Sequence, residues 1–252
     1  MKLGVICCLT RGYVDMKGYD QIIERNRSLW DLSWAHLYDH IIFHEGNISR
    51  DHQAYIVSQC DLPVKFVNIS DSFTRDFDHK NDVCKSLPEL GHSDWYLGYK
   101  RMCRFWFVDF WKYLDNYQYI LRIDEDVHVS DTCQDPIQFC QEHKLHYLSA
   151  YVMDEEDHVI DGLSRFVKMK QEIIKKMPST CANVVEIPYY TKPESLNFIK
   201  TIDKTGCIFR NRWGDAPLMN VLIQKFTDPQ KYTFQWSGFH GYHGSHSRMF
   251  NK

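Results

Sequence analysis

The stretch YQYILRIDEDVHVS, residues 117–130, decides the fold and locates the candidate site. Its first seven residues are mostly apolar and rich in residues with β propensity, which predicts a buried strand over 117–123. The run stops at three acidic residues, Asp124, Glu125 and Asp126. Carboxylates two residues apart at a strand end can point toward one hard cation such as Mn²⁺ or Mg²⁺. An exposed acidic turn is the alternative that this stretch leaves open.

Strands and helices are expected to alternate on the amino-terminal side of this stretch. Strands are predicted there at 2–9, 40–46 and 63–70. A helix is predicted at 18–39, and an aromatic-rich helix is predicted at 96–114. This alternation indicates an α/β fold with a mostly parallel central sheet flanked by helices. Ligands of such sheets bind at the carboxyl ends of the strands. The segments TRG (10–12), HEG (44–46) and the acidic triplet are therefore expected at one edge.

The carboxy-terminal half has a more mixed pattern. A strand is predicted at 146–154, and helices are predicted at 163–177 and 214–226. No internal repeat, low-complexity segment or linker interrupts the chain. The sequence therefore predicts a single domain over residues 1–252.

Composition narrows the class of protein. The 252 residues carry 30 basic and 33 acidic side chains, a formal charge of −3, which argues against general nucleic-acid binding. The nine cysteines form no C-x-x-C pair, so no zinc-ribbon or thioredoxin signal is present. No window approaches the roughly 18–20 apolar residues of a membrane span. We therefore expect a soluble, cytoplasmic protein with mostly reduced thiols and no membrane span.

Isolated acids and histidines in the second half could also carry chemistry. Glu186 in NVVEIPYY (183–190) is an acid inside an apolar run, which is unusual. A catalytic carboxylate and a paired or water-facing structural acid both remain open there. His240, His243 and His246 recur every third residue near the carboxyl end. Their imidazoles could bind a metal or phosphate, and a flexible His-rich tail is the alternative.

Two further segments combine charge with predicted helices. In YKRMCRF, residues 99–105, Arg101 and Arg104 lie three apart and could contact phosphate oxygens or form surface ion pairs. In RWGDAP, Asp215 is predicted to be a helix N-cap, with Pro217 at the first helical turn. On local physics alone, the N-cap role suffices to explain Asp215.

Five segments in a fixed order resemble the fungal α-1,2-mannosyltransferases of glycosyltransferase family 15. They are YKRMCRF, YILRIDEDVHV, NVVEIPYY, IDKTGCIFRNRWGDAPLMNVLI and FHGYHG, within residues 96–244. The resemblance implies a GT-A fold and a metal-dependent, retaining transfer of mannose from GDP-mannose. Mn²⁺, or Mg²⁺, would be the cofactor, and a glycan or glycoprotein would be the acceptor.

The resemblance also assigns roles to residues. Asp124 and Asp126 match the ends of the family's acidic metal motif, and His243 matches a histidine expected near the metal. Glu186 matches the acid proposed as nucleophile, and Asp215 is expected near the sugar or acceptor. The residues expected to contact the nucleotide are Arg11, Tyr99, Arg104 and Arg122.

Two departures from the family keep alternatives open. The acidic motif reads Asp-Glu-Asp where the family usually has Glu-Pro-Asp, and no membrane helix like the family's amino-terminal one is expected in residues 1–252. A transferase that uses another GDP- or UDP-sugar and a non-catalytic nucleotide-sugar-binding module are therefore alternatives. A metal-dependent phosphohydrolase is a third.

Overall fold

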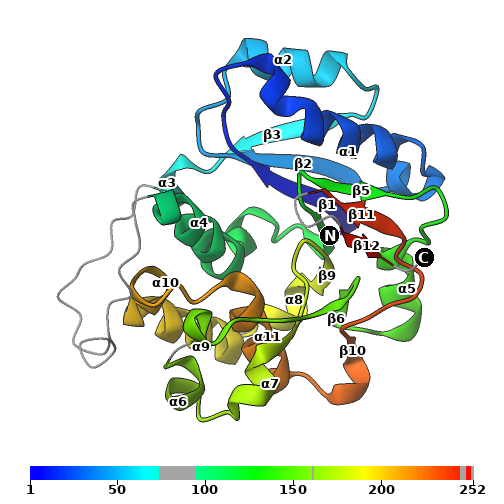
Figure 1. The fold of residues 1–252 in the computed structure, drawn as a ribbon. Helices are drawn as coiled ribbons and strands as arrows, with labels where there is room; N and C mark the ends of the chain where they lie inside the picture. Colours follow the sequence, from blue (N-terminus) through cyan, green and yellow to red (C-terminus); the bar gives the residue numbers. More distant parts are fainter. Residues whose placement is uncertain (74–94, 161, 245–247, 251–252) are drawn as a thin grey trace.

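The computed structural model describes residues 1–73, 95–160, 162–244 and 248–250 (Figure 1). Its central seven-stranded sheet has the strand order β10-β6-β9-β4-β1-β2-β3. β9 is antiparallel to both neighbours, and the other pairs are parallel, so the predicted α/β fold with a mostly parallel sheet is confirmed. The strands are β1 (Lys2–Thr10), β2 (Asp39–His44), β3 (Val64–Asn68), β4 (Tyr117–Ile123), β6 (Tyr147–Ser149), β9 (Ala182–Glu186) and β10 (Tyr232–Thr233).

Helices cover both faces of this sheet, which explains why its inner strands are apolar on both sides. Val5 and Cys7 of β1 pack with residues of α4, α9 and α11, whereas Ile6 packs on the other face with Leu29 of α1 and Ile137 of α5. Figure 1 shows α1 and α2 above β1–β3 and α4, α9 and α11 below them. The longer helices are α1 (Asp20–Trp30), α2 (Arg50–Ser58), α4 (Trp95–Arg104), α5 (Pro136–His143), α9 (Pro193–Thr205) and α11 (Asp215–Phe226).

A second, three-stranded sheet carries the carboxyl-terminal segment back to the acidic triplet. β11 (Gly241–His243) pairs antiparallel with β5 (Val127–Val129) on one side and β12 (Arg248–Phe250) on the other. Figure 1 shows β5 and β11 side by side near the end of β1. Residues more than a hundred positions apart in the sequence thus meet at one edge of the main sheet.

Two predicted helices differ in extent or type from the prediction, and one helix was not predicted. The predicted helix 18–39 ends at Trp30, because Leu32 adopts an extended conformation before a 3₁₀ turn over Ser33–Leu37. The predicted helix 96–114 continues past α4 as a π turn over Phe105–Asp109 and a 3₁₀ turn over Phe110–Tyr113. α2 was not predicted, although Ser49, whose side chain accepts from the backbone N–H of His52, is a recognisable N-cap.

The second half also divides more finely than predicted. The predicted strand 146–154 splits into β6 and β7 (Val152–Asp154), which belong to different sheets. The predicted helix 163–177 ends after one turn because Lys168 takes a left-handed conformation, φ 56°. The elements there are α6 (Leu163–Val167), α7 (Gln171–Lys175) and β8 (Lys176–Pro178). Short helices elsewhere are α3 (Ser70–Phe73), α8 (Ile187–Tyr190) and α10 (Cys207–Arg210).

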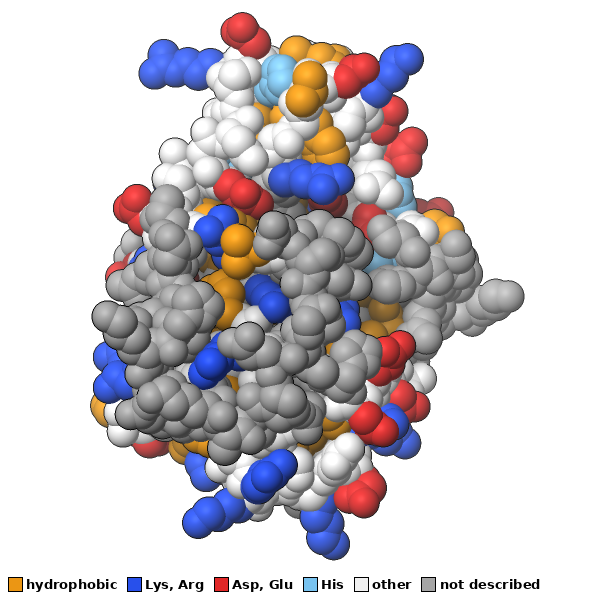
Figure 2. All heavy atoms as spheres, turned by 60° about the vertical axis from the view of Figure 1, so that its left-hand side comes forward, with side chains coloured by type: hydrophobic (Ala, Val, Ile, Leu, Met, Phe, Trp, Pro, Cys, Tyr) orange, Lys and Arg blue, Asp and Glu red, His pale blue; other side chains and the backbone are white. Residues whose placement is uncertain are grey.

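Other features of the chain bear on its surroundings. No described helix is both long and apolar enough to cross a bilayer. Among the residues that the structure describes, seven cysteines are free thiols, whereas Cys207 is disulfide-bonded. Outside the grey residues, Figure 2 shows basic and acidic side chains interspersed on the visible face, in keeping with the balanced charge of the sequence.

Candidate active site

The acidic triplet forms a tight turn between β4 and β5, at the carboxyl edge of the main sheet. The backbone N–H of Val127 donates to the carbonyl of Asp124 over 3.1 Å and closes the turn. The N–H of Asp124 donates to the carbonyl of Cys181 at 2.8 Å, which anchors the turn to the segment before β9. The prediction that the triplet follows a buried strand at this edge is confirmed.

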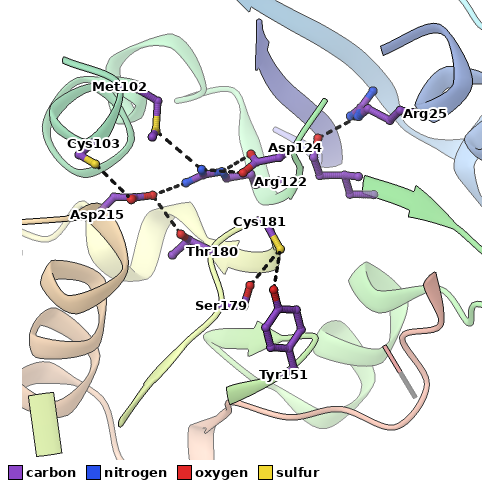
Figure 3. Close-up of polar contacts among 11 residues, drawn as sticks. Arg25, Met102, Cys103, Arg122, Asp124, Tyr151, Ser179, Thr180, Cys181 and Asp215 are labelled. Atoms are coloured by element: carbon purple, nitrogen blue, oxygen red, sulfur yellow. Dashed lines mark hydrogen bonds and ion pairs between the residues drawn. The ribbon is translucent and has the colours of Figure 1, made fainter. Parts of the chain in front are cut away.

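Arg122, the penultimate residue of β4, holds two aspartates together (Figure 3). Its Nε and Nη2 donate to the two carboxylate oxygens of Asp124 at 2.7 and 3.0 Å, and its Nη1 donates to Asp215 at 2.5 Å. The guanidinium also lies 4.4 Å from the ring centroid of Trp106, a cation–π distance. The Arg122 side chain is only 7% exposed, so it organises the acids and does not face solvent.

Asp215 lies at the first turn of α11 but does not cap it. The N-cap is Gly214, and the Asp215 carboxylate instead accepts hydrogen bonds from Arg122 and, at 3.0 Å, from the hydroxyl of Thr180. The Cys103 thiol donates to its other oxygen at 3.5 Å. The predicted N-cap role is therefore wrong, because the buried arginine is a stronger partner than the helix N–H groups. Asp215 is thereby joined to the acidic turn.

Tyr99 approaches this network from α4. The proximity of Cys103, followed by burial and the charge of Asp215, raises the pKa of Tyr99 well above its ordinary value. The guanidinium of Arg212 lies 5.2 Å from the Tyr99 ring centroid. The phenol therefore stays protonated beside Asp215, where its hydroxyl could orient a polar ligand.

Asp126 and His243 form a second cluster of polar side chains at the site. Antiparallel pairing of β11 with β5 places His243 opposite Val127, and the N–H of Gly244 donates to the carbonyl of Asp126 at 2.7 Å. The Nδ1 of His243 lies 3.6 Å from the Oδ2 of Asp126, and the two side chains are 7% and 13% exposed. The structure thus brings together two of the three predicted metal ligands.

This pair fits a divalent cation that also binds a diphosphate. Cis ligands of an octahedral cation with bonds of about 2.1 Å lie about 3 Å apart, so small side-chain rotations would place both atoms on one ion. No group of three His, Cys, Asp or Glu suited to a metal exists within the described residues. Such a site would leave further coordination positions to phosphate and water oxygens, as Mg²⁺-type sites commonly do. Both carboxylate oxygens of Asp124 accept hydrogen bonds from Arg122, so Asp124 would act on a bound cation through its charge.

Glu125 points away from that pair, toward the end of β1. Its carboxylate accepts hydrogen bonds from the Thr10 hydroxyl and, at 3.1 Å, from the Tyr13 hydroxyl. Burial raises the pKa of Glu125, and the two hydroxyls partly oppose that shift. Arg11 lies 4.9 Å from the centroid of the Tyr13 ring and is exposed. Glu125 therefore ties the acidic turn to the TRG segment, where Arg11 is an exposed cation.

Arg104 does not reach this site. Its Nε and Nη2 donate to the two carboxylate oxygens of Asp203 at 2.7 Å each, and its Nη1 donates to Asp109 at 2.5 Å. These bonds tie α4 and its π turn to α9. The prediction that Arg104 contacts the nucleotide is not supported, because all three guanidinium nitrogens are engaged in this 3%-exposed ion pair.

Glu186 lies at the opposite edge of the sheet. β9 runs antiparallel to β4, so that Ala182 pairs with Ile123 near the acidic turn whereas Glu186 pairs with Tyr119. Four residues of strand separate the two edges by about 13 Å. There the Glu186 carboxylate pairs with Nδ1 of His146. The expectation that Glu186 lies beneath the reacting sugar is corrected by the direction of β9.

Other residues of the site were not predicted. Arg25, on the apolar face of α1 and 1% exposed, donates from Nε to the carbonyl of Ile123 at 2.8 Å and fixes the end of β4 (Figure 3). A charged residue at a buried helical position is the signal that could have revealed it. Thr10 and Thr180 carry no such signal. His240 is half-buried, and its carbonyl accepts from the backbone N–H of Ser130, beyond the end of β5 that points away from the acidic turn; His246 lies outside the described residues.

Comparison with curated proteins finds mannosyltransferases. The chain is 23% identical to an O-glycoside α-1,2-mannosyltransferase of Schizosaccharomyces pombe (omh1), over 63% of this chain and 47% of the relative. It is 25% identical to the probable mannosyltransferase KTR3 of Saccharomyces cerevisiae, over 89% of this chain and 66% of the relative. The chain thus spans less than two thirds of either relative. No family model matches it.

Comparison with solved structures gives the same fold. The mannosyltransferase Ktr4p of S. cerevisiae in complex with GDP matches with a TM-score of 0.76 at 17% identity, over 95% of this chain and 70% of that chain. The Mn/GDP form of core-mannan synthase A of Aspergillus fumigatus matches with a TM-score of 0.76 at 15% identity, over 95% and 74%. Both comparisons confirm the resemblance: the chain has the GT-A fold and is similar in sequence to fungal α-1,2-mannosyltransferases, the proteins of glycosyltransferase family 15.

Proposed function

We propose that this chain is a metal-dependent, retaining glycosyltransferase that transfers mannose from GDP-mannose to a glycan or glycoprotein acceptor. The observation that carries the proposal is the Asp126–His243 pair beside the Asp124–Arg122–Asp215 network, at the carboxyl edge of a GT-A sheet. Relatives named as mannosyltransferases, and solved neighbours with GDP and with Mn and GDP, support the choice of donor and metal. Retention rests on the family resemblance. We also propose that residues 1–252 form one such domain.

Each polar residue has a defined task in this proposal. Asp126 and His243 would hold Mn²⁺ or Mg²⁺, which supplies positive charge to the departing diphosphate. Arg11, exposed at the end of β1, would add a charge-assisted contact to phosphate. Arg122 orients the Asp215 carboxylate, which can then accept hydrogen bonds from sugar hydroxyls. Glu186 receives no role, which leaves attack from the leaving-group face as the route to retention that needs no nucleophile there.

Replacement of Asp126 tests the proposal. Asp126→Asn keeps the size of the side chain and removes a metal-binding charge, so Mn²⁺-dependent mannose transfer from GDP-mannose to an α-mannoside should fall by at least about 100-fold. Asp131→Asn is the matched control, since Asp131 is an exposed acid five residues further along the chain. Full activity of the Asp126 variant, or equal losses in both variants, contradicts the assignment.

A nucleotide-sugar-binding module without activity is the second candidate. The observation that favours it is the position of Glu186, about 13 Å along β9 from the acidic turn. Thermal shift with GDP-mannose, other GDP-sugars and UDP-sugars, with and without Mn²⁺, identifies the donor because a ligand that binds the folded state stabilises it. Selective stabilisation without release of GDP over long incubation would favour the binding module. Release of inorganic phosphate would indicate a phosphohydrolase.

The disulfide at Cys207 bears on where this activity operates. Disulfides persist mainly in oxidising compartments and are rare in the cytosol. We therefore propose an oxidising compartment in place of the cytoplasmic location expected from the sequence. Alkylation of the purified, unreduced protein should leave Cys207 unmodified, and modification of Cys207 without reductant would refute this.

A further inference from the structure

A wide pocket lies at the outer edge of the main sheet, between β10 and α5. Its volume is about 610 Å³, within the range of small-molecule sites. None of the residues of the proposed active site lines it. Its lining residues are Phe139, His143, Leu145, Gln230, Tyr232, Thr233, Gln235, Trp236 and Ser237.

One wall of the pocket is a row of three rings. The Phe139 ring lies 4.6 Å from that of Trp236, at an interplanar angle of 30°, and 4.2 Å from that of His143, at 40°. The backbone of Gly238 packs closely against the Trp236 indole, since a Cβ built on Gly238 would come within 2.4 Å of it. The backbone N–H of Trp236 also donates to the carbonyl of Ser149 at the end of β6. The rings therefore form a fixed apolar surface.

Apart from Leu145 and Tyr232, the remaining lining is neutral and polar. Gln230, Thr233, Gln235 and Ser237 contribute amides and hydroxyls, and no Asp, Glu, Lys or Arg lines the pocket. Among the described residues, the side chains of Thr233, Gln235 and Ser237 have no hydrogen-bond partner of their own, so they can bond a ligand. A nucleotide diphosphate would find no cation here other than a protonated His143. The lining instead matches a ligand with apolar faces and many neutral hydroxyls.

From this lining we infer that the pocket between β10 and α5 binds a neutral oligosaccharide, through the aromatic wall of Phe139, His143 and Trp236 and through the amides and hydroxyls of the same pocket. The inference rests on the proposed function in one respect, the choice of α-mannose oligosaccharides as ligand. Sugar rings carry both apolar C–H faces and hydroxyl edges, so they complement a site with aromatic and neutral polar walls.

The pocket is joined to the proposed metal pair by one anchored segment. His243 follows Trp236 by seven positions, a span of at most about 25 Å. The carbonyls of Gly238 and His240 accept from the backbone N–H groups of Gln134 and Ser130, both at 3.0 Å, which fixes the segment along its length. Figure 1 shows the chain passing from β10 beside α5 to β11. The pocket is therefore placed to hold a distal part of a glycan whose end reaches the metal.

Binding can be measured without any transfer activity. In ¹⁵N-labelled protein, linear α-1,2-mannotriose should shift the indole N–H signal of Trp236 in a saturable way, and GDP with Mn²⁺ should leave that signal unchanged. The double variant His143→Ala/Gln235→Ala removes two exposed lining side chains, so folding should persist and mannotriose should bind about tenfold more weakly. Gln141→Ala, an exposed glutamine on α5 outside the pocket, is the matched control.

The outcomes separate this inference from the proposed function. No saturable Trp236 shift with mannotriose, or equal affinity in the double variant and wild type, overturns the oligosaccharide site. A shift of the same signal by GDP would show that the pocket binds nucleotide and would also overturn it. If mannotriose binds at Trp236 while GDP-mannose is never turned over, the site stands and the transferase assignment fails.

Discussion

Arg122 is the residue whose removal should do most damage to the site. Its buried guanidinium makes contacts of 2.7 and 3.0 Å with Asp124 and 2.5 Å with Asp215, which is itself only 8% exposed. The variant Arg122→Met keeps an unbranched apolar stem, removes the guanidinium and leaves both carboxylates without their cation. Breaking a buried ion pair in this way costs about 3–5 kcal/mol. We expect a loss of this size, toward the lower end because Asp124 is 25% exposed.

The loss should depend on pH in a definite direction. Burial already raises the pKa of Asp124 despite Arg122, and removing that cation raises it further. A carboxylate whose folded-state pKa exceeds its unfolded value binds more protons when folded, so the folded state gains stability as pH falls. The deficit of Arg122→Met relative to wild type should therefore be smaller at pH 5 than at pH 7.

Urea unfolding at both pH values measures these quantities, with unchanged m-values as the check on two-state behaviour. Lys2→Met is the matched control, because the Lys2–Asp39 ion pair has the same 2.5 Å distance but side chains that are 65% and 40% exposed. It should lose less than about 1 kcal/mol. A loss below about 1 kcal/mol in Arg122→Met, or a deficit that grows on acidification, would refute the reasoning.

Two further changes test the scaffold. Burial lowers the pKa of His40 to about 4, so below pH 7 the unfolded chain takes up a proton that the folded chain excludes. The wild-type protein should therefore lose unfolding free energy as the pH falls from 7 to 5. In urea unfolding, this loss should be about 2 kcal/mol larger for wild type than for His40→Gln. Equal pH slopes would contradict this. In Gly12→Ala, the new Cβ would lie 2.2 Å from the backbone oxygen of Asn47, which should cost about 1–3 kcal/mol in thermal or urea unfolding. Gly98→Ala is the control, because a Cβ built on Gly98 would meet no atom within 4 Å. This variant should be neutral or stabilising. Similar losses in the two variants would count against the steric argument.

The parallel half of the sheet was predictable because its signals are local. β1, β2, β3 and β4 are short apolar runs bounded by turn residues, and such runs indicate strands whatever their neighbours are. The segments at 146–154 and 163–177 were predicted too long. A left-handed residue such as Lys168 and the division of one run between two sheets leave no periodic signal.

The candidate site was predictable in part. The acidic turn could be placed at the carboxyl edge from strand order alone, and the resemblance supplied His243 and Asp215. The structure places His243 beside Asp126 and joins Asp215 to the acidic turn through Arg122, and their roles at the site stay predictions. Arg104 and Glu186 were misplaced, since a sequence shows neither which partner an arginine finds nor the direction of a strand within its sheet.

The sequence by itself determined strands β1 to β4, the acidic turn that follows β4 and the family to which these segments are similar, because each depends on residues that are neighbours in the chain. Only the tertiary structure decided what surrounds that turn. Pairing of β5 with β11 brings His243 to Asp126 across 117 positions of sequence, and the antiparallel course of β9 takes Glu186 to the far edge. The physical reason is that strand pairing and charge burial depend on residues distant in the sequence, which meet only when the whole sheet and its helices pack together.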